Sequence, residues 1–178
     1  LWVIELSSGE MTRLTNHRYG QVWGGAWFPD GRRIAYSHED RLILLELGSG
    51  QSASYASPRK GRLVRTPAVS PDGRWIALVS GNAEFVFHRL GNLGPSALVL
   101  LPARCAAGTS CAPVQLVAPT ALNTSPAWLD ASSLMFVSNR DGPRDLFAVR
   151  LRSSGEAAGD PVSLSTGLET HTVSVAAD

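Results

Sequence analysis

The chain has 178 residues, of which 44% are hydrophobic and 17% charged, and its formal net charge is +1. This composition supplies enough apolar side chains for a core and too little charge for an intrinsically disordered chain. A net charge near zero gives no strong attraction to nucleic acid, and the longest apolar runs, such as Ala97–Leu101, are far shorter than the roughly 20 residues of a membrane-spanning helix. We therefore expect a globular chain with no nucleic-acid partner and no direct membrane insertion.

The first predicted elements are an alternating apolar strand at Leu1–Leu6 and a shorter, more polar strand at Thr12–Thr15. A longer unit follows, in which "AWFPDGRRIAYS" at Ala26–Ser37 reads as a strand, an aspartate turn and a second strand. The apolar strand Leu42–Leu47 comes next and matches the one that opens the chain. The basic stretch Arg59–Arg65 is short and bracketed by loop residues, so we interpret it as a solvated connection.

The next unit repeats the pattern as "AVSPDGRWIALVS" at Ala68–Ser80. Pro71 presets φ for the first central turn position, and the Asp and Gly after it tolerate a tight corner. Strands are therefore predicted at Thr66–Ser70 and Trp75–Ser80. The turn residues of all the units are interpreted as structural; they are Asp30, Gly31, Asp72, Gly73 and Asp130.

An insertion at Gly81–Ser96 stands where the neighbouring units have only a few residues. Loops carry recognition more often than the elements they connect, and this one holds consecutive apolar residues. We predict a partner-binding segment there, with the alternative that the insertion folds back over its own unit as an extra hairpin. The candidate partner-binding residues are Phe85, Val86, Phe87 and His88.

The apolar strand Ala97–Leu101 leads into the hairpin "PARCAAGTSCAP" at Pro102–Pro113. Cys105 and Cys111 stand on its opposite arms with Gly108 between them, so their Cα atoms can approach the roughly 5.5–6 Å that a disulfide requires. Zinc is the competing interpretation, but two cysteines without a nearby His leave half of a tetrahedral site empty. A disulfide is predicted, and with it an oxidising compartment.

The last complete unit has "AWLDASSLMFVS" at Ala127–Ser138, with further strands at Leu146–Leu151 and Pro161–Ser165. Its turn lacks Pro and Gly and is one residue shorter, so that corner is expected to differ. "TVSVAAD" at Thr172–Asp178 matches the first strand of a further unit. Trp27 and Trp128 occupy the same position in their units, which favours packing between units over a ligand cage.

The aspartate of the turn recurs after 42 residues, from Asp30 to Asp72, and again after 58, at Asp130. Periods of about 40 to 50 residues are typical of propeller blades. The predicted fold class is all-β, a partial β-propeller of four-stranded antiparallel blades with about four blades visible. We expect an open arc whose missing blades lie in further sequence or are replaced by another chain. The predicted blade limits are 1–21, 22–64, 65–120 (with the insertion and the cysteine hairpin), 121–169 and 170–178.

Three stretches, "FPDGRRIAYS", "SPDGRWIALVS" and "FVSNRDGPRDLFAVRL", resemble the TolB-type propeller repeat. The resemblance covers nearly the whole chain, although the Asn-Arg-Asp-Gly hairpin appears only once, at Asn139–Gly142. It implies a noncatalytic interaction or scaffolding module with a protein partner, in the periplasm or at the cell surface.

The sequence holds no Gly-x-Ser-x-Gly elbow, no His-Glu-x-x-His helix and no phosphate-binding Gly-rich loop with Lys. The histidines His17, His38, His88 and His171 fall at unrelated repeat positions, so no catalytic, metal or cofactor site is predicted. Two alternatives to the interaction module stay open. In the first, the chain is the propeller domain of a larger enzyme or receptor, such as a prolyl-oligopeptidase-like serine peptidase or a bacterial receptor kinase. In the second, it is a lyase or hydrolase that acts from a propeller pocket.

Overall fold

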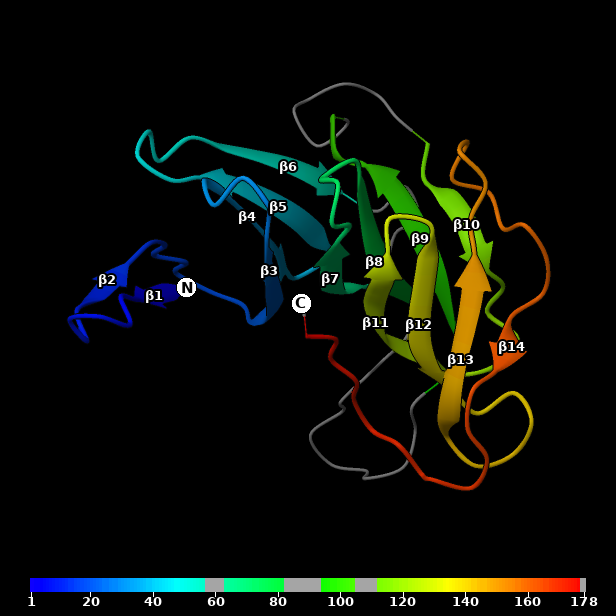
Figure 1. The fold of residues 1–178 in the computed structure, drawn as a ribbon. Coiled ribbons are helices and arrows are strands. Elements are labelled where there is room, and N and C mark those ends of the chain that lie inside the picture. The colour runs from blue at the N-terminus through cyan, green and yellow to red at the C-terminus, as the bar shows by residue number, and fades with distance from the viewer. Residues whose placement is uncertain (57–62, 82–93, 105–111, 177–178) are drawn as a thin grey trace.

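The computed structural model describes residues 1–56, 63–81, 94–104 and 112–176. These residues form fourteen strands and no α-helix. The strands build three four-stranded sheets and one two-stranded sheet, and every pairing is antiparallel (Figure 1). The structure confirms the predicted all-β, partial propeller fold.

The strands follow one another as up-and-down meanders, because each is joined to the next in the chain. The two-stranded sheet is β1 (Trp2–Ile4) and β2 (Met11–Arg13). The first four-stranded sheet is β3 (Val22–Trp27), β4 (Arg33–His38), β5 (Arg41–Glu46) and β6 (Ser52–Ala56). The second is β7 (Leu63–Val69), β8 (Trp75–Gly81), β9 (Ser96–Pro102) and β10 (Val114–Val117). The third is β11 (Asn123–Asp130), β12 (Ser133–Ser138), β13 (Asp145–Arg150) and β14 (Val162–Ser163).

The first strand of each large sheet lies on the inner side of the arc. β7 contacts both β3 and β11, and the remaining strands of each sheet extend outward from these three (Figure 1). This is the arrangement of propeller blades around a common axis. A single sheet cannot bury both of its faces, so stacking neighbouring sheets supplies the core.

The hydrophobic core lies between consecutive sheets, and alternate residues of one strand serve its two sides. In β8, Ile76 and Leu78 pack with residues of the first sheet, whereas Ala77 and Val79 pack with residues of the third. All four side chains are buried. The period of two along a strand produces this division, since successive side chains point to opposite faces.

The inner strand β7 begins earlier than the sequence predicts. It starts at Leu63, so the last residues of the basic stretch Arg59–Arg65 belong to a strand. The Arg65 side chain is only 8% exposed, and its guanidinium carbon lies 4.2 Å from the centroid of the Trp23 ring on β3. The interpretation of this stretch as a solvated connection is therefore wrong for Arg65, because the indole face offers the cation a favourable buried contact.

The two equivalent tryptophans differ in their surroundings. Trp128 is 7% exposed and its indole N–H donates to the Ala68 carbonyl of the second sheet at 3.0 Å, as expected for packing between units. Trp27 is 50% exposed, so the same expectation is wrong for it. The reason is the neighbour: a four-stranded sheet stands beside Trp128, and only the two-stranded sheet β1–β2 precedes the sheet of Trp27.

The C-terminal segment is not a strand. Residues 164–176 carry no strand, although one was predicted from Thr172. The backbone of this segment bonds instead to the start of β13. Gly167 and Leu168 donate N–H to the carboxylate of Asp145, the first residue of β13, at 2.8 and 2.9 Å. Thr170 donates N–H to the carbonyl of Arg144, which precedes the strand, at 2.7 Å. These backbone N–H bonds lower the pKa of Asp145.

Candidate functional site

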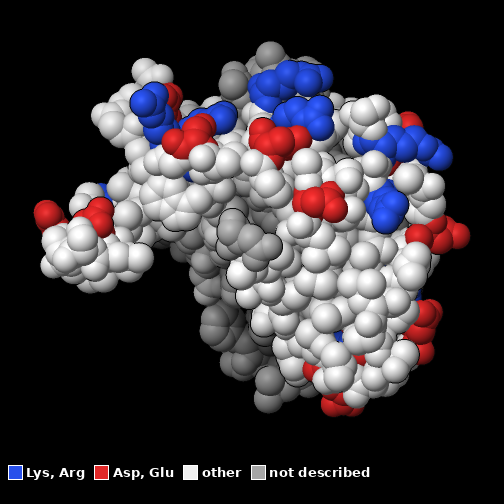
Figure 2. All heavy atoms as spheres, in the orientation of Figure 1, with Lys and Arg blue, Asp and Glu red and all other residues white. Residues whose placement is uncertain are grey.

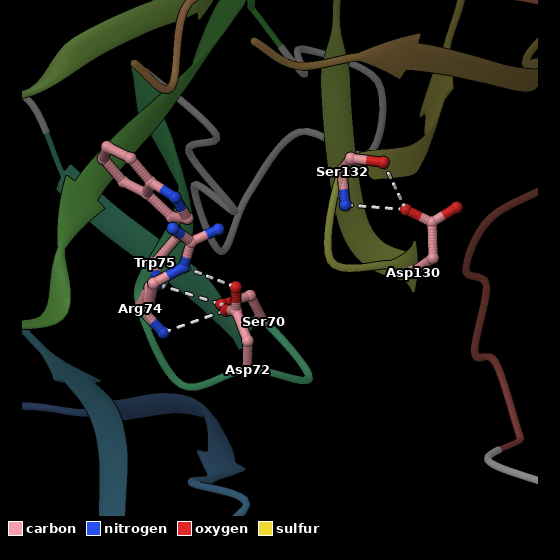
Figure 3. Close-up of polar contacts among 6 residues, drawn as sticks. All are labelled: Ser70, Asp72, Arg74, Trp75, Asp130 and Ser132. Atoms are coloured by element: carbon pink, nitrogen blue, oxygen red, sulfur yellow. Dashed lines mark hydrogen bonds and ion pairs between the residues drawn. The ribbon is translucent and has the colours of Figure 1, made fainter. Parts of the chain in front are cut away.

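The aspartate of each turn is engaged by its own corner. Asp72 accepts hydrogen bonds from the Ser70 hydroxyl at 2.6 Å and the Arg74 backbone N–H at 3.0 Å, and it pairs with the Arg74 guanidinium at 2.6 Å (Figure 3). The Ser70 hydroxyl oxygen in turn accepts a hydrogen bond from the backbone N–H of Trp75 at 2.9 Å. Burial raises the pKa of Asp72, but these bonds to the carboxylate outweigh it and lower the pKa overall.

Asp30 and Asp130 repeat this role. Asp30 accepts from the Arg32 and Arg33 backbone N–H groups at 2.8 and 3.1 Å, and Asp130 accepts from the Ser132 backbone and hydroxyl at 2.6 and 2.8 Å (Figure 3). The backbone bonds are the largest cause of the lowered pKa of both carboxyls. Gly31 and Gly73 have φ of 66° and 69°, which glycine adopts without strain. Each of these carboxylates therefore holds its own corner through bonds to turn N–H groups.

A buried polar cluster lies where the predicted partner-binding insertion joins the sheet. β8 ends at Gly81 and β9 begins at Ser96, and these two residues are paired in register. Ser96 is fully buried and bonds reciprocally with Asn123 of the third sheet. Its hydroxyl donates to the Asn123 carbonyl at 2.5 Å and accepts from the Asn123 N–H at 2.9 Å, and its carbonyl accepts from the Asn123 side-chain amide at 2.6 Å.

Arg140 completes this cluster from the β12–β13 turn. Its guanidinium donates to the Asn123 side-chain oxygen at 2.9 Å and to the Ser138 hydroxyl at 3.1 Å. Its central carbon lies 5.2 and 4.9 Å from the ring centroids of Phe136 and Phe147. We name Ser96, Asn123 and Arg140 the rim cluster. It fixes one end of the insertion to the next sheet, because satisfied buried polar networks are rigid.

The sequence analysis did not predict the rim cluster. The one sequence feature that points to it is the Asn139–Gly142 hairpin of the repeat, which contains Arg140. The candidate partner-binding residues themselves, Phe85, Val86, Phe87 and His88, lie outside the described residues, and so do Cys105 and Cys111.

The three inner strands share a bulge at equivalent positions. Gly24, Thr66 and Ser125 have φ of 68°, 44° and 49°, and the register of β3, β7 and β11 shifts beside each of them. A left-handed conformation is unusual for a β-branched residue such as Thr. The Thr66 hydroxyl is also buried without a hydrogen-bond partner in the described part of the chain. The bulges bend the inner strands where the blades approach one another.

The structure brings together two histidines that the sequence treats as unrelated. The His17 and His38 rings stack with centroids 3.9 Å apart and an interplanar angle of 15°. They do not form part of a metal cluster: within the described ranges, no group of three or more His, Cys, Asp or Glu side chains is arranged to hold a metal ion.

Charge is mixed on the face that Figure 2 presents, where basic and acidic side chains lie near one another with uncharged areas between them. This face therefore presents no single-sign charge field. Among the residues that the structure describes, no helix is long and apolar enough to cross a membrane.

No family model matches the sequence, and a search of curated proteins finds no match. Solved structures are similar in fold. A protein described as TolB from Agrobacterium tumefaciens has a TM-score of 0.63 at 20% identity, covering 92% of this chain and 52% of that one. Oligogalacturonate lyase from Vibrio parahaemolyticus has a TM-score of 0.69 at 13% identity, covering 94% and 46%. A puromycin-hydrolyzing peptidase from Mycobacterium tuberculosis has a TM-score of 0.60 at 17% identity, covering 83% and 24%.

These likenesses show a TolB-like propeller fold. The chain spans about half the length of the TolB protein from A. tumefaciens and a quarter of the peptidase.

Proposed function

We propose that the chain is a noncatalytic protein-interaction or scaffolding module of TolB-like propeller type, which works outside the cytoplasm as part of a larger assembly. The observation that carries this proposal is the rim cluster. Ser96 is fully buried and bonded to the neighbouring sheet, so an insertion that the other units lack starts from a rigid base. Recognition loops on rigid scaffolds are the usual way in which a repeated fold acquires a partner.

The partner is a protein. The insertion carries the apolar sequence Phe85, Val86 and Phe87, and apolar and aromatic side chains anchor protein interfaces. The mixed charge of the face in Figure 2 and the formal net charge of +1 provide no strong field for nucleic acid or an anionic membrane.

The extracytoplasmic setting rests on the fold likeness and on the predicted Cys105–Cys111 disulfide, because disulfides persist in oxidising compartments. Thiol titration of the denatured, unreduced protein is expected to find no reactive thiol. Two reactive thiols would remove the argument for this compartment.

Site-specific photocrosslinking tests the interaction. A benzophenone amino acid placed at Phe85 or Phe87 in the full chain is expected to crosslink a discrete protein in periplasmic extract. The same probe at Ser52, an exposed residue of the outer strand β6, should give no such product. Replacing residues 82–93 by a two-residue Asn-Gly turn should abolish the interaction, measured with the purified partner, while the thermal midpoint stays near that of the wild type.

Equal crosslinking from Ser52 and from the insertion would contradict the proposal, and so would binding that survives the shortened loop. A loop variant that does not fold is replaced by Phe85→Ser with Phe87→Ser, which leaves the chain length unchanged.

A second candidate function is supported by the likeness to the puromycin-hydrolyzing peptidase: this chain is the propeller domain of a larger enzyme. In that case the insertion contacts a catalytic domain of the same polypeptide. The crosslink in the full-length protein would then be intramolecular, with no change in mass on denaturing gels.

A further inference from the structure

Two stacked histidines join the N-terminal segment to the first four-stranded sheet. His17 lies between β2 and β3, and His38 is the last residue of β4. Their ring centroids are 3.9 Å apart. We propose that this pair is a proton-sensitive clasp, which holds residues 1–21 on the sheet when neutral and releases them on acidification.

Each ring has a defined polar partner. His17 Nε2 lies 3.0 Å from the Tyr36 hydroxyl, which belongs to a residue that is 2% exposed. His38 Nε2 lies 2.8 Å from the Tyr19 carbonyl, and because a carbonyl only accepts, this nitrogen carries a hydrogen. His38 thus bonds back to the segment that contains His17, and the two rings tie that segment to β4 from both sides.

Other contacts also hold the segment on the sheet. Leu1 and Leu14 pack on a cluster formed by Tyr36, Ile43 and Leu45, and the Glu39 N–H donates to the Gln21 carbonyl at 3.4 Å. The side chains of Trp2 and Ile4 on β1 are 56% and 52% exposed. The histidine pair adds ring stacking and two polar contacts to this attachment.

Charged groups of both signs stand close to the pair in the chain. The Glu39 carboxylate lies against Gly20, and Arg41 stands opposite His38 in the β4–β5 register with its Nε 3.9 Å from an Asp40 carboxylate oxygen. Arg18 follows His17 in the chain, and the Tyr36 hydroxyl lies 3.0 Å from His17 Nε2. The Leu1 nitrogen donates to the Thr15 hydroxyl at 2.7 Å within the same segment.

Protonation of both rings opposes the clasp, because it places two like charges on rings whose centroids are 3.9 Å apart. Burial is the largest cause of the lowered pKa of His17, and the nearby His38 lowers it further. A lowered folded-state pKa means that the released segment binds protons more readily than the clasped one. The clasp is at full strength above the ordinary histidine pKa of about 6.5, and it weakens as pH falls below that value.

Hydrogen exchange of the full chain tests the clasp. After correction for intrinsic exchange, the opening of residues 14–21 should increase on the order of tenfold between about pH 7.5 and about pH 5, because two like charges about 4 Å apart repel by more than RT even near a surface. Ser133–Arg150, which spans β12 and β13, is the internal reference and should show no such increase.

His38→Gln removes the second charge and should abolish most of this pH response. His171→Gln is the matched control, because His171 is exposed and contacts Arg144 far from the clasp, and it should respond as the wild type does. An unchanged opening of the wild type at acidic pH overturns the proposal, and so does an equal response in His38→Gln.

If His38→Gln disturbs the sheet, the second test is a titration of the wild-type histidines by nuclear magnetic resonance. The clasp requires His17 to titrate below the ordinary histidine pKa of about 6.5. A His17 pKa at or above that value overturns it. Neither measurement uses a partner protein, so the outcome is separate from that of the proposed interaction function.

Discussion

Single residues close the corners on which this fold depends. The Asp72 carboxylate accepts hydrogen bonds from a hydroxyl and a backbone N–H of its own turn and pairs with the side chain of Arg74. Asp30 and Asp130 bind their turns in the same way although Asp130 lacks the Pro and Gly neighbours. The carboxylate itself is thus the part of the motif that every corner needs, since it satisfies turn N–H groups that no strand pairs.

Asp72→Ala is expected to lower the free energy of unfolding by about 1–2 kcal/mol, because it removes bonds between a charged acceptor and turn donors. Asp40→Ala is the control: Asp40 is exposed and has a 3.9 Å ion pair with Arg41, so its loss should stay within about 0.5 kcal/mol. Urea denaturation at neutral pH measures both changes, and equal losses would contradict the role of the turn carboxylate.

The difference between the wild type and Asp72→Ala should also depend on pH. The pKa of Asp72 is lowered in the folded state, so its stabilisation is complete above the ordinary pKa of about 3.8. It should disappear as pH falls through the lowered value.

Bulges set the shape of the inner strands at the scale of the element. Gly24, Thr66 and Ser125 adopt left-handed φ at the same place in β3, β7 and β11, yet only the first is glycine. A Cβ on Gly24 would meet the Thr66 Cα at 3.3 Å, which shows how closely β3 and β7 approach there. The bulge is therefore a feature of every inner strand described. In β7 and β11 it is formed by Thr66 and Ser125, for which a left-handed φ is strained.

Thr66→Gly is expected to raise the free energy of unfolding by about 0.5–1 kcal/mol. Glycine relieves the left-handed strain and removes a buried hydroxyl without a hydrogen-bond partner in the described residues. Thr124→Gly should instead destabilise by about 0.5–1 kcal/mol, because Thr124 pairs with Val137 just before the β11 bulge and does not itself have a left-handed φ. Chemical denaturation of both variants decides the matter; a loss of stability in Thr66→Gly comparable to that in Thr124→Gly would show that packing of the methyl group outweighs strain.

Stacking of sheets governs stability at the scale of the whole molecule. The equivalent residues Trp27 and Trp128 are 50% and 7% exposed. In the described part of the chain, the sheet that precedes that of Trp128 has four strands, and the sheet that precedes that of Trp27 has two. Exposure at a repeat position thus depends on the adjacent sheet rather than on the residue type.

Trp128→Ala is expected to cost about 3–5 kcal/mol, the usual range for deleting a buried aromatic side chain. It also leaves the Ala68 carbonyl without its indole donor. Trp27→Ala should cost less than about 2 kcal/mol, since half of that side chain is already exposed. Comparable losses in the two variants, measured as denaturation midpoints under one set of conditions, would show that another part of the protein covers Trp27.

Much of this fold could be predicted from the sequence. The recurring turn around Asp30 and Asp72, and the alternation in Leu42–Leu47, predict antiparallel meanders of blade size. These features are local, because a turn depends on four or five neighbouring residues and alternation depends on the period of the strand. The sequence by itself therefore determined the class of fold and the order of the strands within each sheet.

Only the tertiary structure decided which side chains meet across sheets. Arg65 stacks on Trp23, Ser96 bonds with Asn123, and His17 stacks on His38, although each pair is separated by about 20 to 40 residues in the chain. No periodicity encodes these contacts, because they depend on how one twisted sheet lies against the next. The rim cluster therefore emerges only when neighbouring blades stack and remove polar side chains from water, so that these side chains need hydrogen-bond partners in the protein. The contact between His17 and His38 emerges only when the β2–β3 connection lies against the end of β4.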